Sequence, residues 1–513
     1  MLLLTGTQTN AIEMQNVTKT FGSVVANDRV SLAVRRGEIL ALLGENGSGK
    51  TTLMNMLSGI YFPDSGHILV DGKPVTIRSP KDSFALGIGM IHQHFKLVDV
   101  LTAAENIVLG LPGGMQLDRK KLNEEIREIS GKYGFVIDPD KKIYRMSVSE
   151  KQTVEIIKVL YRGADILILD EPTAVLTPQE TDRLFDILRA MKADGKSILI
   201  ITHKLAEVLA VSDRVTILRK GQYIGTVDTA EANAQSLTDM MVGRAMQLSI
   251  HRTEVEQKPL CMVRNLMVRH KDGHIALDNI SFDLHGGEIL GVAGVAGSGQ
   301  KELCEALTGL QHTESGSVKI NGVDTTAMNP NQILKAGIRI GFVPEDRLGM
   351  GLVGSMDITD NLLVRGYRKQ KGFFLHRKPA MEQAGMLIDW LEVNTTGPGQ
   401  RVSKLSGGNV QKVLLGRELL EEPQMIVSAY PVRGLDIGAS YTVYDLLQAQ
   451  KEKGVGVLFV GEDLDVLLEL CDRIMVLCGG AVSGIVDARS VTKEQIGLMM
   501  THRGALEEVA QGE

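Results

Sequence analysis

Two kinds of hydrophobic pattern alternate along the whole chain. Continuous apolar runs such as DILILD (165–170) are typical of strands that are covered on both faces of a sheet. Between such runs lie segments with a helical period. Residues 177–195 are the clearest of these, because Leu184, Leu188 and Met191 fall on one face. This alternation of strands and helices predicts an α/β fold with parallel strands.

The chain contains the same pattern twice. Segment 35–53 returns as 285–303, an offset of 285 − 35 = 250, and segment 198–218 returns as 457–477, an offset of 457 − 198 = 259. The second half therefore holds 259 − 250 = 9 additional residues between these landmarks. The polar stretch 249–259 separates the two copies. The expected organisation is a first half at 1–248, a linker at 249–259, a second half at 260–505 and a tail at 506–513.

Composition and charge narrow the class of protein. The 513 residues are 43% hydrophobic and 23% charged, and the net charge is −6, so no broad basic surface for nucleic acid is expected. No apolar run reaches the roughly 18–20 residues of a membrane helix, and the opening MLLLTGTQTN lacks the basic segment of a signal peptide. We expect a cytosolic chain unless a partner holds it at a membrane. Four cysteines without CxxC spacing are expected to be buried free thiols: Cys261, Cys304, Cys471 and Cys478.

A phosphate-binding loop is predicted in the first half. The segment GENGSGKT (44–51) matches GxxxxGK[ST] and lies between an apolar run and a helical pattern. Glycines let the backbone N–H groups surround phosphate oxygens at a helix N-terminus, Lys50 reaches the outer phosphates, and Thr51 is placed for Mg²⁺. A glycine-rich turn that contains a lysine by chance is the alternative, and it does not explain this context. The predicted phosphate-binding residues are Gly44, Asn46, Gly47, Ser48, Gly49, Lys50, Thr51 and Thr52.

Three further residues of the first half have the chemistry to act on a bound nucleotide. Asp170 and Glu171 end the strand pattern ILILD, where Asp170 would hold the Mg²⁺ shell and Glu171 would orient and polarise the attacking water. His203 follows a later apolar strand, where an imidazole can reach the γ-phosphate. An exposed acidic pair and a structural histidine are the alternatives. The strand-end positions after a P-loop favour the functional interpretation.

The order of these motifs resembles that of the ATP-binding cassette ATPases. A P-loop, Gln93, a serine–glycine signature, the acid pair and the histidine follow one another, and the resemblance covers nearly the whole chain twice. It implies that Gln93 contacts Mg²⁺ and senses a transmembrane partner, and that Phe21 stacks on adenine. A core position is the alternative for this phenylalanine. Each half is then expected to combine a parallel-sheet ATPase core, an antiparallel β subdomain and a helical subdomain.

The second half lacks the catalytic side chains of the first. In its P-loop, GVAGSGQK (294–301), Gln300 replaces the lysine and Lys301 replaces the Mg²⁺-binding hydroxyl. Losing one transition-state contact commonly lowers a rate by a factor of about 10²–10³. We therefore expect no useful ATP hydrolysis from the residues of the second half. The remaining replacements are Glu345 for the loop glutamine, Ala429 and Tyr430 for the acid pair, and Glu462 for the histidine.

The signature motifs show the opposite distribution. The second half has an intact LSGGN (405–409), in which Ser406, Gly407 and Gly408 can donate to a γ-phosphate, whereas the first half has MSVSEK (146–151). In the family that the chain resembles, two cassettes close head to tail, and each ATP lies between the P-loop of one and the signature of the other. The resemblance therefore implies one working composite site and one inactive site. Independent decay of the second half is the alternative.

Two cassettes in one chain, with the second degenerate, resemble the ATPase subunits of bacterial importers for sugars and nucleosides. The segment 90–110 and the missing acid pair resemble the nucleoside branch, which is associated with a basic-membrane-protein-type lipoprotein receptor. The resemblance implies ATP and Mg²⁺ as cofactors and two transmembrane permease subunits and, indirectly, an extracytoplasmic substrate-binding lipoprotein as partners. It also implies a peripheral position at the cytoplasmic face of the inner membrane. A ribose- or galactose-type importer is the alternative. A cytosolic tandem-cassette translation factor fits less well, because those proteins usually have two intact sites.

Overall fold

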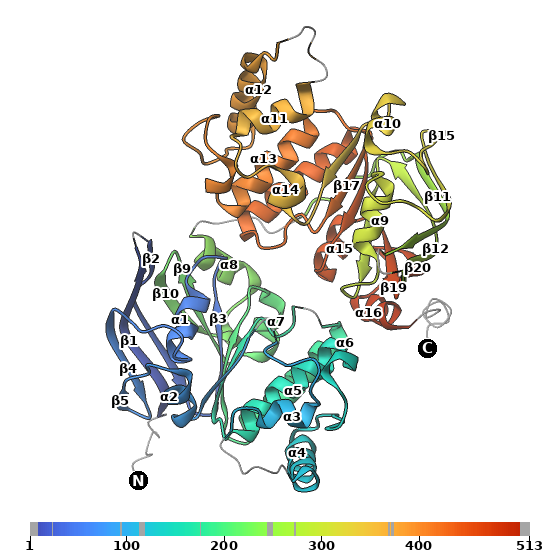
Figure 1. The fold of residues 1–513 in the computed structure, drawn as a ribbon. Helices are drawn as coiled ribbons and strands as arrows, with labels where there is room; N and C mark the ends of the chain where they lie inside the picture. The colour runs from blue at the N-terminus through green and yellow to red at the C-terminus, as the bar shows by residue number, and fades with distance from the viewer. Residues whose placement is uncertain are drawn as a thin grey trace. The chain divides into compact units, whose positions relative to one another are not determined.

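The structure is a computed structural model. It describes residues 9–22, 24–92, 95–111, 118–174, 176–243, 250–270, 273–367, 370 and 374–502. The chain forms two compact units, Met1–Gln247 and Leu248–Glu513 (Figure 1). Each unit has hydrophobic cores of its own.

A six-stranded sheet forms the centre of the first unit, with the strand order β10-β9-β3-β8-β7-β6. Neighbouring strands are parallel except for the edge pair β9 and β10, which is antiparallel. Every residue of β3, β7 and β8 is buried, so the continuous apolar runs are strands covered on both faces, as predicted. The strands are β3 (Ile39–Leu43), β6 (Ile88–Ile91), β7 (Ile166–Asp170), β8 (Ser197–Ile201), β9 (Arg214–Arg219) and β10 (Gln222–Asp228).

A second sheet and a group of helices complete the first unit. The second sheet is antiparallel and has the order β2-β1-β4-β5, from β1 (Asn10–Phe21), β2 (Val24–Arg35), β4 (Ser65–Val70) and β5 (Lys73–Val75). Helices α3, α4 and α5 pack together as a helical subdomain (Figure 1). The helices are α1 (Lys50–Leu57), α2 (Pro80–Ala85), α3 (Ala103–Val108), α4 (Arg119–Tyr133), α5 (Val148–Tyr161), α6 (Pro178–Ala193), α7 (Leu205–Val211) and α8 (Ala234–Val242).

The helix predicted at 177–195 is α6. Its N-cap is Thr177, whose hydroxyl accepts the N–H of Glu180, while the Glu180 carboxylate accepts the N–H of Thr177 at 2.9 Å. The three residues predicted to share a face, Leu184, Leu188 and Met191, are all buried. Local capping and the apolar stripe therefore agree on the position of this helix.

The second unit repeats the first element by element. Its sheets have the orders β12-β11-β14-β15 and β16-β17-β18-β13-β19-β20, and the edge pair β19 and β20 is again antiparallel. Its strands are β11 (Lys258–Arg269), β12 (Ile275–Gly286), β13 (Ile289–Gly294), β14 (Ser315–Ile320), β15 (Val323–Asp324), β16 (Ile340–Val343), β17 (Met425–Ala429), β18 (Gly456–Val460), β19 (Arg473–Cys478) and β20 (Ala481–Asp487). Its helices are α9 (Gln300–Leu307), α10 (Pro330–Lys335), α11 (Ile358–Gly366), α12 (Arg377–Trp390), α13 (Gly407–Leu419), α14 (Ile437–Glu452), α15 (Leu464–Leu470) and α16 (Lys493–Thr501). The expected fold class, two tandem α/β cassettes, is confirmed.

A lysine–aspartate pair braces the central sheet in both units. Lys192 pairs with Asp213 at 2.5 Å, and Lys451 pairs with Asp472 at 2.6 Å. Each aspartate also accepts the first N–H of the central strand, β3 or β13. The lysine side chain is 37% exposed in the first unit and 1% exposed in the second. The same bond is therefore in contact with water in one unit and buried in the other.

The cysteines are all in the second unit and are free thiols. Cys261, Cys304 and Cys471 are buried as predicted, whereas Cys478 is only partly buried, because it ends the strand β19. Burial raises the pKa of Cys261 to about 12. The buried thiols are therefore protonated and unreactive at neutral pH.

Candidate functional site

The first P-loop connects the buried strand β3 to helix α1. Gly49 precedes the helix with a φ of 96°, a left-handed conformation that glycine adopts without strain. A Cβ on Gly44 would clash with the carbonyl of Leu218, and a Cβ on Gly49 would clash with the carbonyl of Ala26. The loop glycines therefore allow a close backbone approach. The hydroxyl of Ser48 is buried and has no hydrogen-bond partner among the described residues.

The P-loop lysine is folded back onto its own loop. Lys50 is 6% exposed, and its Nζ donates to the carbonyl oxygens of Gly44 at 2.6 Å and Glu45 at 3.0 Å. Burial lowers the pKa of Lys50, and the negative charges of Glu171, Asp170 and Glu45 oppose that shift. An ammonium group held in this way faces the two acidic residues at the end of β7.

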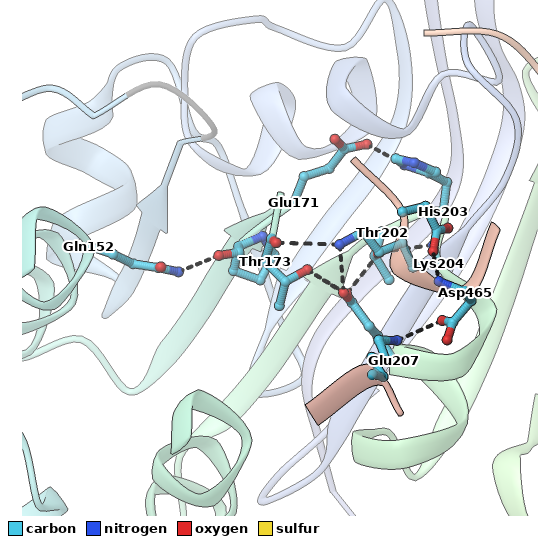
Figure 2. Close-up of polar contacts among 11 residues, drawn as sticks. Gln152, Glu171, Thr173, Thr202, His203, Lys204, Glu207 and Asp465 are labelled. Atoms are coloured by element: carbon cyan, nitrogen blue, oxygen red, sulfur yellow. Dashed lines mark hydrogen bonds and ion pairs between the residues drawn. The ribbon is translucent and has the colours of Figure 1, made fainter. Parts of the chain in front are cut away.

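The predicted acid pair and histidine lie together in the first unit. Nδ1 of His203 is 2.9 Å from Oε1 of Glu171 (Figure 2). The hydrogen bond from His203 is the main reason that the pKa of Glu171 is lowered. Burial, followed by the charge of Glu171, raises the pKa of Asp170 to about 6. The pKa values of these two neighbouring carboxyl groups are therefore shifted in opposite directions, which is common at catalytic sites.

A polar network supports this turn, and the motif analysis did not identify it. Gln152 in α5 donates to the carbonyl of Pro172 at 2.7 Å (Figure 2). The Thr173 hydroxyl donates to the carboxylate of Glu207 at 2.6 Å, and Lys204 pairs with the same carboxylate at 3.0 Å. These bonds connect helices α5 and α7 to the end of β7. The bonds made by Gln152 and Thr173 link residues that are 20 and 34 positions apart in the chain, so no short motif indicates them.

Phe21, the residue predicted to stack on adenine, is exposed in the structure. Phe21 is 43% exposed at the end of β1, with the ring of Tyr61 at 5.1 Å edge-on and Nζ of Lys19 at 5.5 Å. It is therefore not a core residue, and its exposed ring is compatible with stacking on a base. Gln93 lies outside the described residues.

The second P-loop keeps the backbone of the first without its charge. Gly297 and Gly299 have φ values of 87° and 97°, close to those of Gly47 and Gly49. Gln300 is 3% exposed, and its amide donates to the carbonyl of Val295 at 3.1 Å. The glutamine therefore takes over one of the two hydrogen bonds that the lysine makes to its loop but offers no cation.

An ion cluster replaces the acid–histidine contact in the second unit. Arg433 pairs with Glu345 and, at 3.3 Å, with Glu462. Tyr430, at the position of Glu171, is largely buried, and burial raises the pKa of its hydroxyl. Gln411, the counterpart of Gln152 (411 − 259 = 152), is buried with no side-chain hydrogen bond among the described residues. No side chain here resembles a general base beside an imidazole.

The two signature helices begin differently. In the first unit the hydroxyl of Ser147 accepts the N–H of Glu150 at 3.2 Å, and the Glu150 carboxylate accepts the N–H of Ser147 at 2.7 Å. The sequence Ser-x-x-Glu is the signal for this capping box. In the second unit Ser406 makes no such cap, and its hydroxyl accepts a hydrogen bond from the Asn409 amide at 2.8 Å. The first turn of α13 therefore keeps N–H groups available for an anion, whereas a carboxylate already lies at the first turn of α5.

Two cassettes, each with a P-loop and a signature helix, and a strand-end acid pair in the first of them, define the class of protein. The sequence model of the ABC transporter family matches residues 27–174 and again residues 277–428. The chain therefore belongs to the ABC transporter family and carries two of its ATP-binding cassettes.

Individual relatives resemble the chain over nearly its full length. It is 42% identical over 495 residues to the nucleoside import ATP-binding protein NupA of Lactococcus lactis subsp. cremoris, covering 95% of this chain and 97% of that protein. The guanosine import ATP-binding protein NupO of Bacillus subtilis is equally similar, at 42% identity with the same coverage. The galactose/methyl galactoside import ATP-binding protein MglA of Escherichia coli is 37% identical over 492 residues, covering 94% of this chain and 96% of that protein.

Proposed function

We propose that this protein is the ATP-hydrolysing subunit that powers an importer for nucleosides. The observation that carries the proposal is the Glu171–His203 contact next to Lys50 and Asp170, a complete set that only the first unit holds. The substrate class is supported by the two relatives at 42% identity, which are named for nucleoside and guanosine import, against 37% for the galactose relative. A monosaccharide importer of the ribose or galactose type is the alternative, because ribose import proteins are also similar, at 39% identity.

The residues at the first P-loop fit a nucleotide with Mg²⁺. The buried Ser48 hydroxyl has no protein partner among the described residues, and Gly44 and Gly49 allow the close backbone packing that shapes the loop. The carboxyl of Asp170 is buried and hard to ionise, a cost that a divalent cation offsets. Thr51, Asp170 and Gln93 would hold the ion, which when bound neutralises charge on the β- and γ-phosphates.

The side chains of the first unit have distinct roles in hydrolysis. Lys50 binds the outer phosphates, and Phe21 stacks on the adenine. Glu171, ionised because His203 donates to it, orients the attacking water and accepts its proton as the bond to the γ-phosphorus forms and the bond to ADP breaks. His203 both holds Glu171 and lies at the strand end from which it reaches the γ-phosphate.

The second unit is proposed to donate its signature to this ATP. Ser406 and the N–H groups of Gly407 and Gly408 are not used in a cap, whereas Ser147 and Glu150 of the first unit satisfy one another. One working composite site, formed by the first P-loop and the second signature, follows from this distribution. The other pairing would combine Gln300 with a signature that carries a carboxylate, and it is proposed to be inactive.

The partners follow from this role. Importer subunits named like the relatives work with a membrane permease and a substrate-binding protein. We propose two permease subunits, a lipoprotein receptor and a peripheral position at the cytoplasmic face of the inner membrane. No helix within the described part of the chain is long and apolar enough to cross a membrane.

Two measurements test the proposal. In proteoliposomes that contain the permease and receptor, Glu171→Gln and Ser406→Arg are each expected to abolish ATP hydrolysis, although the two residues lie in different units. Full activity of Ser406→Arg would disprove the composite site. Uptake of labelled guanosine, ribose and galactose by cells with and without the protein decides the substrate. Sugar uptake without nucleoside uptake would disprove the nucleoside assignment.

A further inference from the structure

One arginine of the second unit is partly buried without an acidic partner. Arg347 begins a short helical turn, Arg347–Gly351, directly after strand β16. Among the described residues, the only hydrogen bond of its side chain is the one that Nη2 donates to the carbonyl of Arg433. Burial lowers its pKa, and no carboxylate opposes that shift. A partly exposed guanidinium without an acidic partner is accessible to an anion from outside this unit.

Arg347 lies beside the signature of the same unit. Its Nη1 is 3.7 Å from the position that a Cβ on Gly407 would occupy, at the first residue of α13. The N-cap residue Ser406 leaves the N–H groups of this first turn without a side-chain cap. The carboxylate of Asp436, which is also close to this turn, is engaged as the N-cap of α14. A cation and open N–H donors therefore meet at one point on the surface of the second unit.

The turn that carries Arg347 lies in a loop that is longer in the second unit than in the first. In both units an asparagine of the following helix forms two hydrogen bonds with the backbone of one loop residue. The side-chain oxygen of Asn106 accepts the N–H of Val98 at 2.8 Å, and its amide donates to the Val98 carbonyl at 3.1 Å. Asn361 makes the same two bonds to Val353, at the same distances. From the end of the preceding strand to this anchor the chain spans 98 − 91 = 7 residues in the first unit and 353 − 343 = 10 in the second. Three additional residues therefore accommodate the turn in the unit whose signature is intact.

We propose that Arg347 is a γ-phosphate-binding residue of the working ATP site. With Ser406 and the N–H groups of the signature, its guanidinium would bind the γ-phosphate of the ATP held by the first P-loop. It would bind the transition state more strongly, because negative charge spreads over the transferred oxygens. This inference rests on the composite site proposed above. It assigns to the second unit a charge contribution in addition to its backbone donors.

The test separates a charge role from a structural one. In the assembled importer, Arg347→Ala and Arg347→Gln are both expected to lower kcat by about 100-fold or more, the scale for losing one transition-state donor. The KM for ATP should change by less than about threefold, and vanadate trapping of ADP should be lost, because charge stabilisation is largest in the transition state. Glutamine keeps an amide that can donate to the Arg433 carbonyl. Recovery of kcat in Arg347→Gln would therefore show a structural role and overturn the proposal.

Control variants identify which idea fails. Lys404→Met removes an exposed positive charge two residues before Ser406 and is expected to leave kcat within about twofold. Arg347→Lys should retain part of the rate through its charge. If Ser406→Arg abolishes hydrolysis while Arg347→Ala does not, the composite site stands and Arg347 has no part in it. If neither Ser406→Arg nor Arg347→Ala lowers the rate of ATP hydrolysis, the proposal of a composite site is itself wrong.

Discussion

Replacing the lysine of the lysine–aspartate pair is expected to lower the stability of the second unit much more than that of the first. Lys451→Met and Lys192→Met remove the same bond from the same place in the two units. Lys451 is 1% exposed and its partner Asp472 is 13% exposed, whereas Lys192 and Asp213 are each 37% exposed. Methionine has about the length of the lysine stem, so little cavity is created. The difference between the two variants therefore reports the cost of leaving an unpaired carboxylate at two levels of burial.

The magnitudes follow from that burial. Removing one partner of a buried pair costs about 3–5 kcal/mol. Asp472 keeps the N–H of β13 and some contact with water, so the lower end, about 3 kcal/mol, is expected for Lys451→Met. An exposed pair contributes about 0–1 kcal/mol, so Lys192→Met should cost less than about 1 kcal/mol. Domain stabilities are about 5–15 kcal/mol, and the second unit of Lys451→Met should remain folded.

Unfolding in urea, followed by hydrogen exchange of peptides from β3 and β13, measures each unit separately. The single tryptophan, Trp390 in α12, gives an independent fluorescence signal for the second unit. Adding Asp472→Asn to Lys451→Met should recover most of the loss, because the unpaired charge is then gone. Equal losses in Lys451→Met and Lys192→Met, or no recovery in the double variant, would refute the reasoning.

Three further predictions concern the first unit. Without nucleotide, Asp170→Asn should stabilise this unit by up to about 3 kcal/mol at pH 8. The gain should disappear as the pH falls from about 6 to below 4, because the raised pKa of Asp170 disfavours the ionised form in the folded state; urea unfolding at several pH values checks this. Gly44→Ala should weaken ATP binding at least tenfold by calorimetry, because the added Cβ clashes with backbone; Gly47→Ala should also weaken binding, through strain at its left-handed φ of 80° and not through a clash. Phe21→Ala should raise the KM for ATP about tenfold in steady-state kinetics with kcat unchanged, since base stacking contributes about 1–3 kcal/mol, and Phe21→Trp should preserve it.

The sequence was sufficient to predict the features that short patterns encode. Continuous apolar runs located the buried strands, and the repeated motifs predicted that both units have the same topology. Strand-end positions identified Glu171 and His203 as candidate nucleotide-site residues, but the hydrogen bond between their side chains was not predicted. The antiparallel edge strands β10 and β20 were not anticipated, since a hairpin at a sheet edge leaves the pattern of the central strands unchanged.

Other parts of the site depend on contacts that no local pattern encodes. The Arg433 cluster joins residues from Glu345 to Glu462, a separation of 462 − 345 = 117 positions, so only the folded chain brings them together. The Gln152 bond to Pro172 is likewise tertiary. In contrast, the capping box of Ser147 and Glu150 has a sequence signal, Ser-x-x-Glu, that can be identified without the structure.

The turn that follows β7 in the first unit has the same backbone conformation as the turn that follows β17 in the second, although the side chains differ. Glu171 and Tyr430 have φ values of 46° and 49°, a left-handed conformation that is unfavourable for both side chains. In each unit the N–H of this residue donates to the last carbonyl of the neighbouring strand, at 2.8 and 3.0 Å. Selection on folding alone is thus enough to preserve the turn, while the side chain that it presents is free to diverge. One of two tandem cassettes can therefore change these side chains without losing its architecture, and the second unit offers a backbone onto which an acid, a lysine and a histidine could be introduced by design.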